Sequence, residues 1–176
     1  KHAYVKRGDN YGITFMSPFK SLDSNLFYVR NGKDHNMAAS TLIDEKIYLA
    51  GNLKTGNDGS IYYEPTFGVI KEWRSGYTYT SLADLPETPH YLRLFNIDGA
   101  VYAASESATG LLTIYQYNNE SNSWSVKGSK QFENKFSLAT ASVKEGRIYM
   151  AAPDGGNAAI FNYHPLEGFK LHQKTS

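Results

Sequence analysis

The sequence has no cysteine, no excess of either charge and no long apolar run. The absence of cysteine excludes disulfide bonds, thiolate metal sites and a thiol nucleophile. The 18 basic and 17 acidic residues leave a formal net charge of +1, so the chain lacks the concentrated positive field that binds nucleic acids or anionic membranes. Apolar stretches extend for only a few residues, whereas a bilayer span needs about 20. We therefore expect neither a nucleic-acid partner nor a membrane span.

The chain is instead rich in aromatic residues, with 14 Tyr, 9 Phe and 2 Trp. Aromatic and β-branched side chains suit pleated, half-buried surfaces, and the Gly, Asn and Ser residues between the apolar runs suit turns. No segment shows the 3.6-residue periodicity of an amphipathic helix. At 176 residues the chain is long enough for one domain with a sizeable core. The composition therefore favours an all-β fold.

A hairpin-like unit recurs three times, at 35–50, 90–104 and 136–151. Each copy is an apolar run, a short polar turn, and then Ile or Val followed by Tyr, any residue and Ala. This pattern predicts two strands joined by a tight hairpin. A loop with Gly or Asn and a second pair of strands follow each copy.

The third-strand isoleucines, at 13, 61, 114 and 160, are separated by 48 (61 − 13), 53 (114 − 61) and 46 (160 − 114) residues. Four strands every 40–50 residues are typical of a β-propeller blade. We expect a single propeller domain of antiparallel four-stranded blades, with strands two to four of one blade at 1–30 and full blades at about 31–76, 77–128 and 129–176. Two arrangements stay open: a ring of about four blades, or part of a larger propeller that a second copy or a neighbouring chain completes.

Two turns resemble motifs of known propeller families. Tyr117 to Trp124 is similar to the kelch pattern of Tyr-Asp-Pro, a short turn and Asn-x-Trp, although the paired glycines of kelch strand two are absent. Ser21, Asp23 and Phe27 resemble the Asp-box of sialidases, and 118–124 is a more degenerate copy. Both motifs imply a structural device in which a carboxylate caps backbone N–H groups and an aromatic ring packs between blades.

The stretch from about 4 to 54 resembles the propeller of phage endosialidase tailspikes. The matching features are residues 5–9, the Asp-box-like turn, His35 and residues 48–52. The resemblance implies that Arg7 binds a sialic acid carboxylate, with Lys54 near the place of a second arginine. It implies polysaccharide binding more than hydrolysis, and a virion or extracellular location, with the cytoplasm left open.

Candidate ligand-binding residues lie in the loops between strands two and three and between strand four and the next blade. These loops share one face of a propeller, around the central channel, where ligands bind. Tyrosines beside Asn, Asp and Arg suit a sugar, which offers an apolar face and many hydroxyls. Arg7 and Asp9 also fit a surface ion pair, and His35 and His90, at equivalent places in two blades, fit a structural role. The candidates are Arg7, Asp9, Tyr11, Arg30, His35, Asn52, Lys54, Arg74, Tyr77, His90, Glu106, Asp154 and Asn157.

Three functions follow, in decreasing order of preference. The first is recognition of a surface glycan, the second a kelch-like protein interaction, and the third a sialidase-like glycoside hydrolase that needs residues outside this chain. Hydrolysis requires two facing carboxylates, and nothing in the sequence pairs any two. We assign no catalytic residue, and no motif indicates a metal site or a cofactor.

Overall fold

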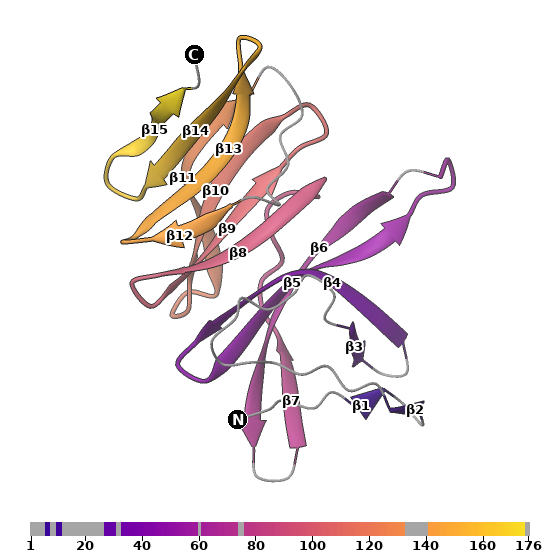
Figure 1. The fold of residues 1–176 in the computed structure, drawn as a ribbon. Coiled ribbons are helices and arrows are strands. Elements are labelled where there is room, and N and C mark those ends of the chain that lie inside the picture. The colour runs from indigo at the N-terminus through magenta and orange to yellow at the C-terminus, as the bar shows by residue number, and fades with distance from the viewer. Residues whose placement is uncertain are drawn as a thin grey trace.

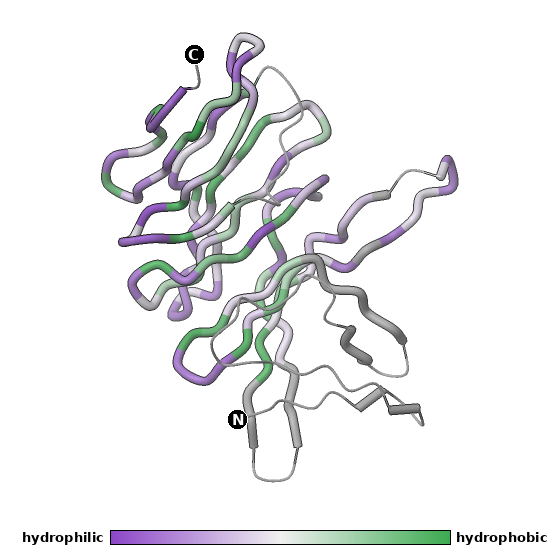
Figure 2. Tube along the Cα trace, in the orientation of Figure 1, coloured by the Kyte–Doolittle hydropathy of each residue, from purple (hydrophilic) through white to green (hydrophobic). Residues whose placement is uncertain are grey.

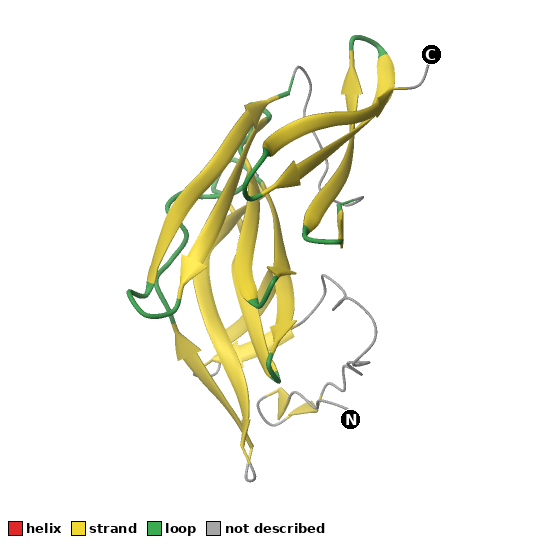
Figure 3. Cartoon of the chain, turned by 90° about the vertical axis from the view of Figure 1, so that its left-hand side faces the viewer, coloured by secondary structure: helices red, strands yellow, loops and turns green. Residues whose placement is uncertain are grey.

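The computed structural model describes residues 6–7, 10–11, 27–30, 33–59, 61–73, 76–132 and 141–174. Within these ranges the chain forms strands and turns, with no helix (Figure 3). The strands are β1 (Lys6–Arg7), β2 (Asn10–Tyr11), β3 (Phe27–Arg30), β4 (Lys33–Ile43), β5 (Lys46–Thr55), β6 (Ile61–Trp73), β7 (Gly76–Ser81), β8 (Tyr91–Ile97), β9 (Ala100–Glu106), β10 (Leu111–Asn118), β11 (Ser123–Gln131), β12 (Ser142–Lys144), β13 (Arg147–Asp154), β14 (Asn157–His164) and β15 (Gly168–Lys174).

Three antiparallel sheets form the body of the molecule, each with its strands in chain order. They are β3 to β7, β8 to β11 and β12 to β15, while β1 and β2 form a separate small hairpin. The sheet β8 to β11 lies between the other two, with one apolar core on each side (Figure 1). Sheets packed face to face in series are the blades of a propeller, so the all-β propeller fold expected from the repeat is confirmed.

The three predicted hairpins are present, and all use the same turn. Their central residues are Asp44 and Glu45, Asp98 and Gly99, and Glu145 and Gly146, all with φ between 46° and 78°. Two consecutive positive φ values define the type I′ turn, whose twist matches that of the flanking strands. The local sequence therefore determines the link between the first and second strand in each of these three hairpins.

The borders of the first blade differ from the expected ones. Strand four was expected at 71–73, but β6 continues to Trp73, and the fourth strand of the repeat is β7, which ends at Ser81 instead of near 76. The register of β6 against β5 shifts between Ala50 and Asn52. This irregularity interrupts the alternation of side chains, so one long strand has the sequence pattern of two.

The N-terminal strands also differ from the expected partial blade. Strand four of that blade was predicted at 26–29, but β3 pairs with β4, from Phe27 opposite Asn36 to Arg30 opposite Lys33. It therefore adds a fifth strand to the first sheet. Most of the remaining predicted strands of 1–30 lie outside the described residues.

The recurring Tyr-x-Ala of the second strand packs each sheet onto the next. Tyr48 and Ala50 belong to the core between the first and second sheets, and Tyr102 and Ala104 belong to the core between the second and third. All four side chains are buried. Because side chains alternate along a strand, Ala103, which lies between Tyr102 and Ala104, faces the other core. Figure 2 shows apolar stretches along these strands and hydrophilic residues at the turns.

The kelch-like turn between β10 and β11 is capped by its own side chain. The Asn118 Oδ1 atom accepts hydrogen bonds from the backbone N–H groups of Glu120 and Ser121, at 2.9 and 3.0 Å. Capping was expected from a carboxylate, and an asparagine amide oxygen provides it here, as is common in Asx turns. The turn therefore has hydrogen bonds of its own, independent of its contacts with the rest of the molecule.

The same turn holds the first sheet against the second. The Trp124 ring lies 4.7 Å from the Phe67 ring in an edge-to-face arrangement, and its Nε1 donates to the Ala83 carbonyl at 2.9 Å. The Oδ1 atom of Asn122 accepts from the Ala83 N–H at 2.8 Å. The aromatic ring therefore packs between blades, and the polar atoms of the turn fix the chain that leaves the first sheet.

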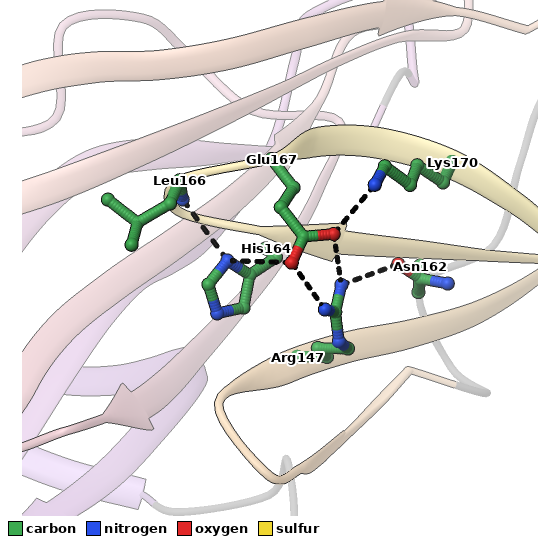
Figure 4. A network of polar contacts seen from close by, with 6 residues as sticks. All are labelled: Arg147, Asn162, His164, Leu166, Glu167 and Lys170. Carbon is green, nitrogen blue, oxygen red and sulfur yellow. Dashed lines mark hydrogen bonds and ion pairs between the residues drawn. The ribbon is translucent and has the colours of Figure 1, made fainter.

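A polar network ties β13 to the turn before β15 (Figure 4). Arg147 donates to both carboxylate oxygens of Glu167, at 2.6 and 3.1 Å, and Lys170 donates to the same carboxylate at 2.7 Å. Arg147 also donates to Asn162 at 3.4 Å, and the Nδ1 atom of His164 lies 4.0 Å from Glu167. The hydrogen bonds from Arg147 and then from Lys170 lower the pKa of Glu167 to about 2.

We expect the turns to respond to substitution according to their φ angles. Gly99→Ala should lower the free energy of unfolding by about 1 kcal/mol, because φ is +78° and the added Cβ meets no other atom, so only backbone strain acts. Glu145→Asn creates Asn-Gly, the preferred type I′ pair, and should raise stability by roughly 0.5–1 kcal/mol. Urea unfolding of both variants measures this. If both substitutions changed the free energy of unfolding in the same direction, the turn assignment would be contradicted.

The depressed pKa of Glu167 predicts a specific dependence of stability on pH. The carboxylate stabilises the folded state above its ordinary pKa of 4.5, and this contribution is lost as pH falls from about 4.5 through about 2. The stability difference between the unchanged chain and Glu167→Gln should therefore shrink over that window in chemical unfolding at stepped pH. Glu145→Gln is the control, since that carboxylate is largely exposed and lies 3.9 Å from Lys144. A constant difference down to pH 2 would refute the role of the network.

Candidate functional site

The connection 82–90 brings the start of the second sheet beside one end of the first. Its Leu85 N–H donates to the Pro65 carbonyl at 2.7 Å, and the Tyr63 N–H donates to the Pro89 carbonyl at 3.3 Å. The connection therefore follows β6 toward the β5–β6 loop and ends at His90, directly before β8. The tip of the β5–β6 hairpin projects beyond the sheets and is hydrophilic (Figures 1 and 2). This end of the molecule is the predicted ligand-binding face.

Two of the predicted ligand residues meet on Glu64, at the base of that hairpin. The Asn52 Nδ2 atom donates to Glu64 Oε2 at 3.0 Å, and the Lys54 Nζ atom lies 3.6 Å from Glu64 Oε1. Asn52 is only 2% exposed, whereas the charged side chains are each about two fifths exposed. A buried amide thus orients a carboxylate whose ion pair faces solvent.

Glu106 holds the corresponding position in the second sheet. It follows the strand-two tyrosine by four residues (106 − 102), as Asn52 does (52 − 48), and its side chain is fully buried. Its carbonyl accepts a hydrogen bond from the His90 N–H at 2.8 Å. Burial of a polar side chain is costly, so two buried polar residues at equivalent positions indicate a requirement at this end of the blades. The third sheet has Pro153 at this position.

Aromatic rings adjoin these polar groups. The Tyr91 ring is 41% exposed and stands edge-to-face against the His90 ring, at 4.8 Å between centroids. Burial raises the pKa of Tyr63, and the nearby Tyr91 hydroxyl raises it further. Tyr62 is 37% exposed. The first two sheets therefore contribute neighbouring tyrosines.

A buried acceptor lies within the connection itself. Burial raises the pKa of Tyr115, the charge and hydrogen bond of Glu87 raise it further, and a hydrogen bond with Thr113 partly offsets the rise. The Glu87 Oε1 atom is buried and has no hydrogen-bond partner among the described residues. The junction of the two sheets thus holds a carboxylate that is hydrogen-bonded to the Tyr115 side chain.

We call these residues, which lie at one end of the first two sheets, the cross-blade site. Its members are Asn52, Lys54, Tyr62, Tyr63, Glu64, Glu87, His90, Tyr91 and Glu106. The sequence pointed to Asn52, Lys54, His90 and Glu106, which lie at the same end of adjoining sheets. Four of the other five, Tyr62, Tyr63, Glu64 and Tyr91, were missed because they lie in segments expected to be strands, and Glu87 was missed because the proline-rich segment was interpreted only as a loop between blades. The unusual run of tyrosines around Glu64 is the signal that could have identified them.

Two predicted residues lie apart from this site. Asp154 and Asn157 pair across a tight turn formed by Gly155 and Gly156, and the Asp154 carboxylate forms an ion pair with Lys174 at 2.9 Å. They belong to a surface hairpin of the third sheet, so the structure does not bring them to the cross-blade site.

The remaining predicted residues cannot be placed in the site. Asp9 and Arg74 lie outside the described residues, and the side chains of five others are not described although their backbones belong to strands. These five are Arg7, Tyr11, Arg30, His35 and Tyr77.

No metal centre is evident in the described ranges, where no three His, Asp or Glu side chains are grouped to hold an ion. In the same part of the chain, no helix is long and apolar enough to span a bilayer.

Comparison with known proteins supports the fold. No protein-family model matches the chain, and no curated protein matches it. Solved structures do match, among them the one titled "Structure of YjhT", with a TM-score of 0.60 over 85% of this chain and 12% sequence identity. The chain spans 55% of the length of that structure. At this identity the likeness concerns the fold alone, and it agrees with the series of propeller blades.

Proposed function

We propose that the chain recognises a carbohydrate, of the surface-polysaccharide type, at the cross-blade site. The observation that carries this proposal is the exposed Tyr91, which stands edge-to-face against His90 and lies near Tyr63, the residue that precedes Glu64 of the Lys54–Glu64 ion pair. A flat exposed ring and fixed charged hydrogen-bonding groups at the same end of two adjoining sheets match the two-sided character of a sugar.

The chemistry of a pyranose fits these groups. Its C–H face is apolar and stacks on an aromatic ring, for which tyrosine supplies both contact area and a hydroxyl. Its hydroxyls both donate and accept, so they can use the lysine ammonium as a donor and the carboxylate of Glu64 as an acceptor. Asn52 holds that carboxylate in place, which reduces the entropy lost on binding.

The site differs from a protein-binding surface in its composition. The exposed apolar surface that it contributes comes from Tyr62 and Tyr91, which carry hydroxyls. Protein-interaction patches are usually contiguous apolar areas of several hundred Å². The mixture of separate rings and charges favours a hydroxyl-rich ligand.

The test is glycan binding by the unchanged chain and by two Tyr91 variants. A glycan array identifies a ligand, and calorimetry then gives its affinity. Tyr91→Ala should weaken binding by about tenfold because the stacking ring is lost, and Tyr91→Phe should weaken it by less than about threefold because the ring remains. Leu166→Ala is the control, since Leu166 is 91% exposed in the turn before β15, and it should bind normally.

Two results would refute the proposal. One is an array on which the folded, unchanged chain binds no glycan. The other is a bound glycan whose affinity is the same for Tyr91→Ala and for the unchanged chain.

A further inference from the structure

Four apolar residues form the face of the second sheet that packs on the third. In the second sheet, Tyr102 and Ala104 of β9 and Leu112 and Ile114 of β10 lie in the core against the third sheet. Ala104 is paired with Ile114 across the two strands. The four side chains are at most 5% exposed, so this face is fully covered by the sheet that follows.

The third sheet repeats this face but leaves it exposed. Its equivalent residues are Tyr149, Ala151, Ala158 and Ile160, with Ala151 paired to Ile160 as Ala104 is to Ile114. Ile160 is 38% exposed where Ile114 is fully buried, and Ala151 and Ala158 are also exposed. We call these four residues the terminal face. An exposed copy of a face that is elsewhere a packed core indicates a missing neighbour.

The existing junctions define what this neighbour must present. Across from Tyr102 and Ala104, the third sheet places Ile148 and Met150 on its second strand and Tyr163 on its third. Burial raises the pKa of Tyr163 to about 12, and the Tyr102 hydroxyl adds to the rise, so the two phenols are close.

The first junction repeats this arrangement. Burial raises the pKa of Tyr117, and the nearby Tyr48 raises it further. Val101 and Ala103 of the second sheet belong to the same core. Each junction therefore joins a Tyr-x-Ala face to two aliphatic residues spaced two apart and one tyrosine.

We propose that the terminal face docks a further β-sheet blade that carries this complementary set and lies outside this chain. The chain spans 55% of the length of a structure that shares its fold, which leaves length there for additional blades. A second copy of this chain is a poorer occupant. Its first sheet would have to present Ile47 and Leu49, which alternate with Tyr48, and both are already buried, at 9% and 0% exposure.

The experiment supplies such a blade from the chain itself. Residues 132–174 are repeated after Lys174, so that the added sheet follows the third as the third follows the second. Amide hydrogen exchange at Ala151 and Ile160 should slow by at least about tenfold compared with the unextended chain, because their strands move from a surface to a junction.

Matched variants separate docking from mere lengthening of the chain. Ile148→Asp and Met150→Asp, made only in the added copy, should abolish the protection. Ala151→Arg should abolish it in the extended chain, yet leave the unextended chain as stable as before because that position is exposed.

Three outcomes would overturn the proposal. The first is unchanged exchange at both residues in a folded extended chain. The second is protection that persists in the aspartate variants. The third is a dimer of the unextended chain, seen by sedimentation, that Ala151→Arg dissociates, since it would assign the face to a second copy. None of these measurements involves the cross-blade site, so none of them tests the glycan proposal.

Discussion

The second sheet of this protein is apolar on both faces, and this constraint organises the sheets on either side of it. Along β9, Tyr102 and Ala104 face one core while Val101 and Ala103 face the other. A sheet of this kind is stable only when a neighbour covers each side, because exposed apolar area on either face costs free energy. The middle sheet meets this requirement fully and therefore anchors the sheets on both sides of it.

The candidate site is a consequence of this stacking. The chain must pass from the outer strand of one sheet to the inner strand of the next, and the connection 82–90 makes this passage along β6. It therefore carries Glu87 and His90 to a place where two sheets converge, beside side chains that the first sheet presents from β5 and β6. Residues between 23 (87 − 64) and 38 (90 − 52) positions apart in the sequence therefore lie at one end of the first two sheets.

Features that depend on local chemistry could be predicted from the sequence. Features that depend on pairing between strands distant in the sequence could not. The type I′ turns were predictable because residues such as Asp98 and Gly99 tolerate positive φ. The end of the first sheet was not, because the register shift opposite Asn52 is set by pairing between β5 and β6. Glu64 was missed for the same reason: its role depends on Asn52 and Lys54, which only the strand register brings beside it. Tyr91 was missed because exposure is a property of the packed molecule.

The turn between β10 and β11 also has a consequence for the order in which the chain matures. Ala83 leaves the first sheet, and its carbonyl is held by Trp124, 41 residues later. During synthesis, the first blade can form its own hairpins, but its departing edge is secured only after most of the second blade has left the ribosome. The packing of the first blade on the second is therefore completed only when this tryptophan is in place, and a nascent chain that stops before it lacks the indole that packs on the Phe67 ring.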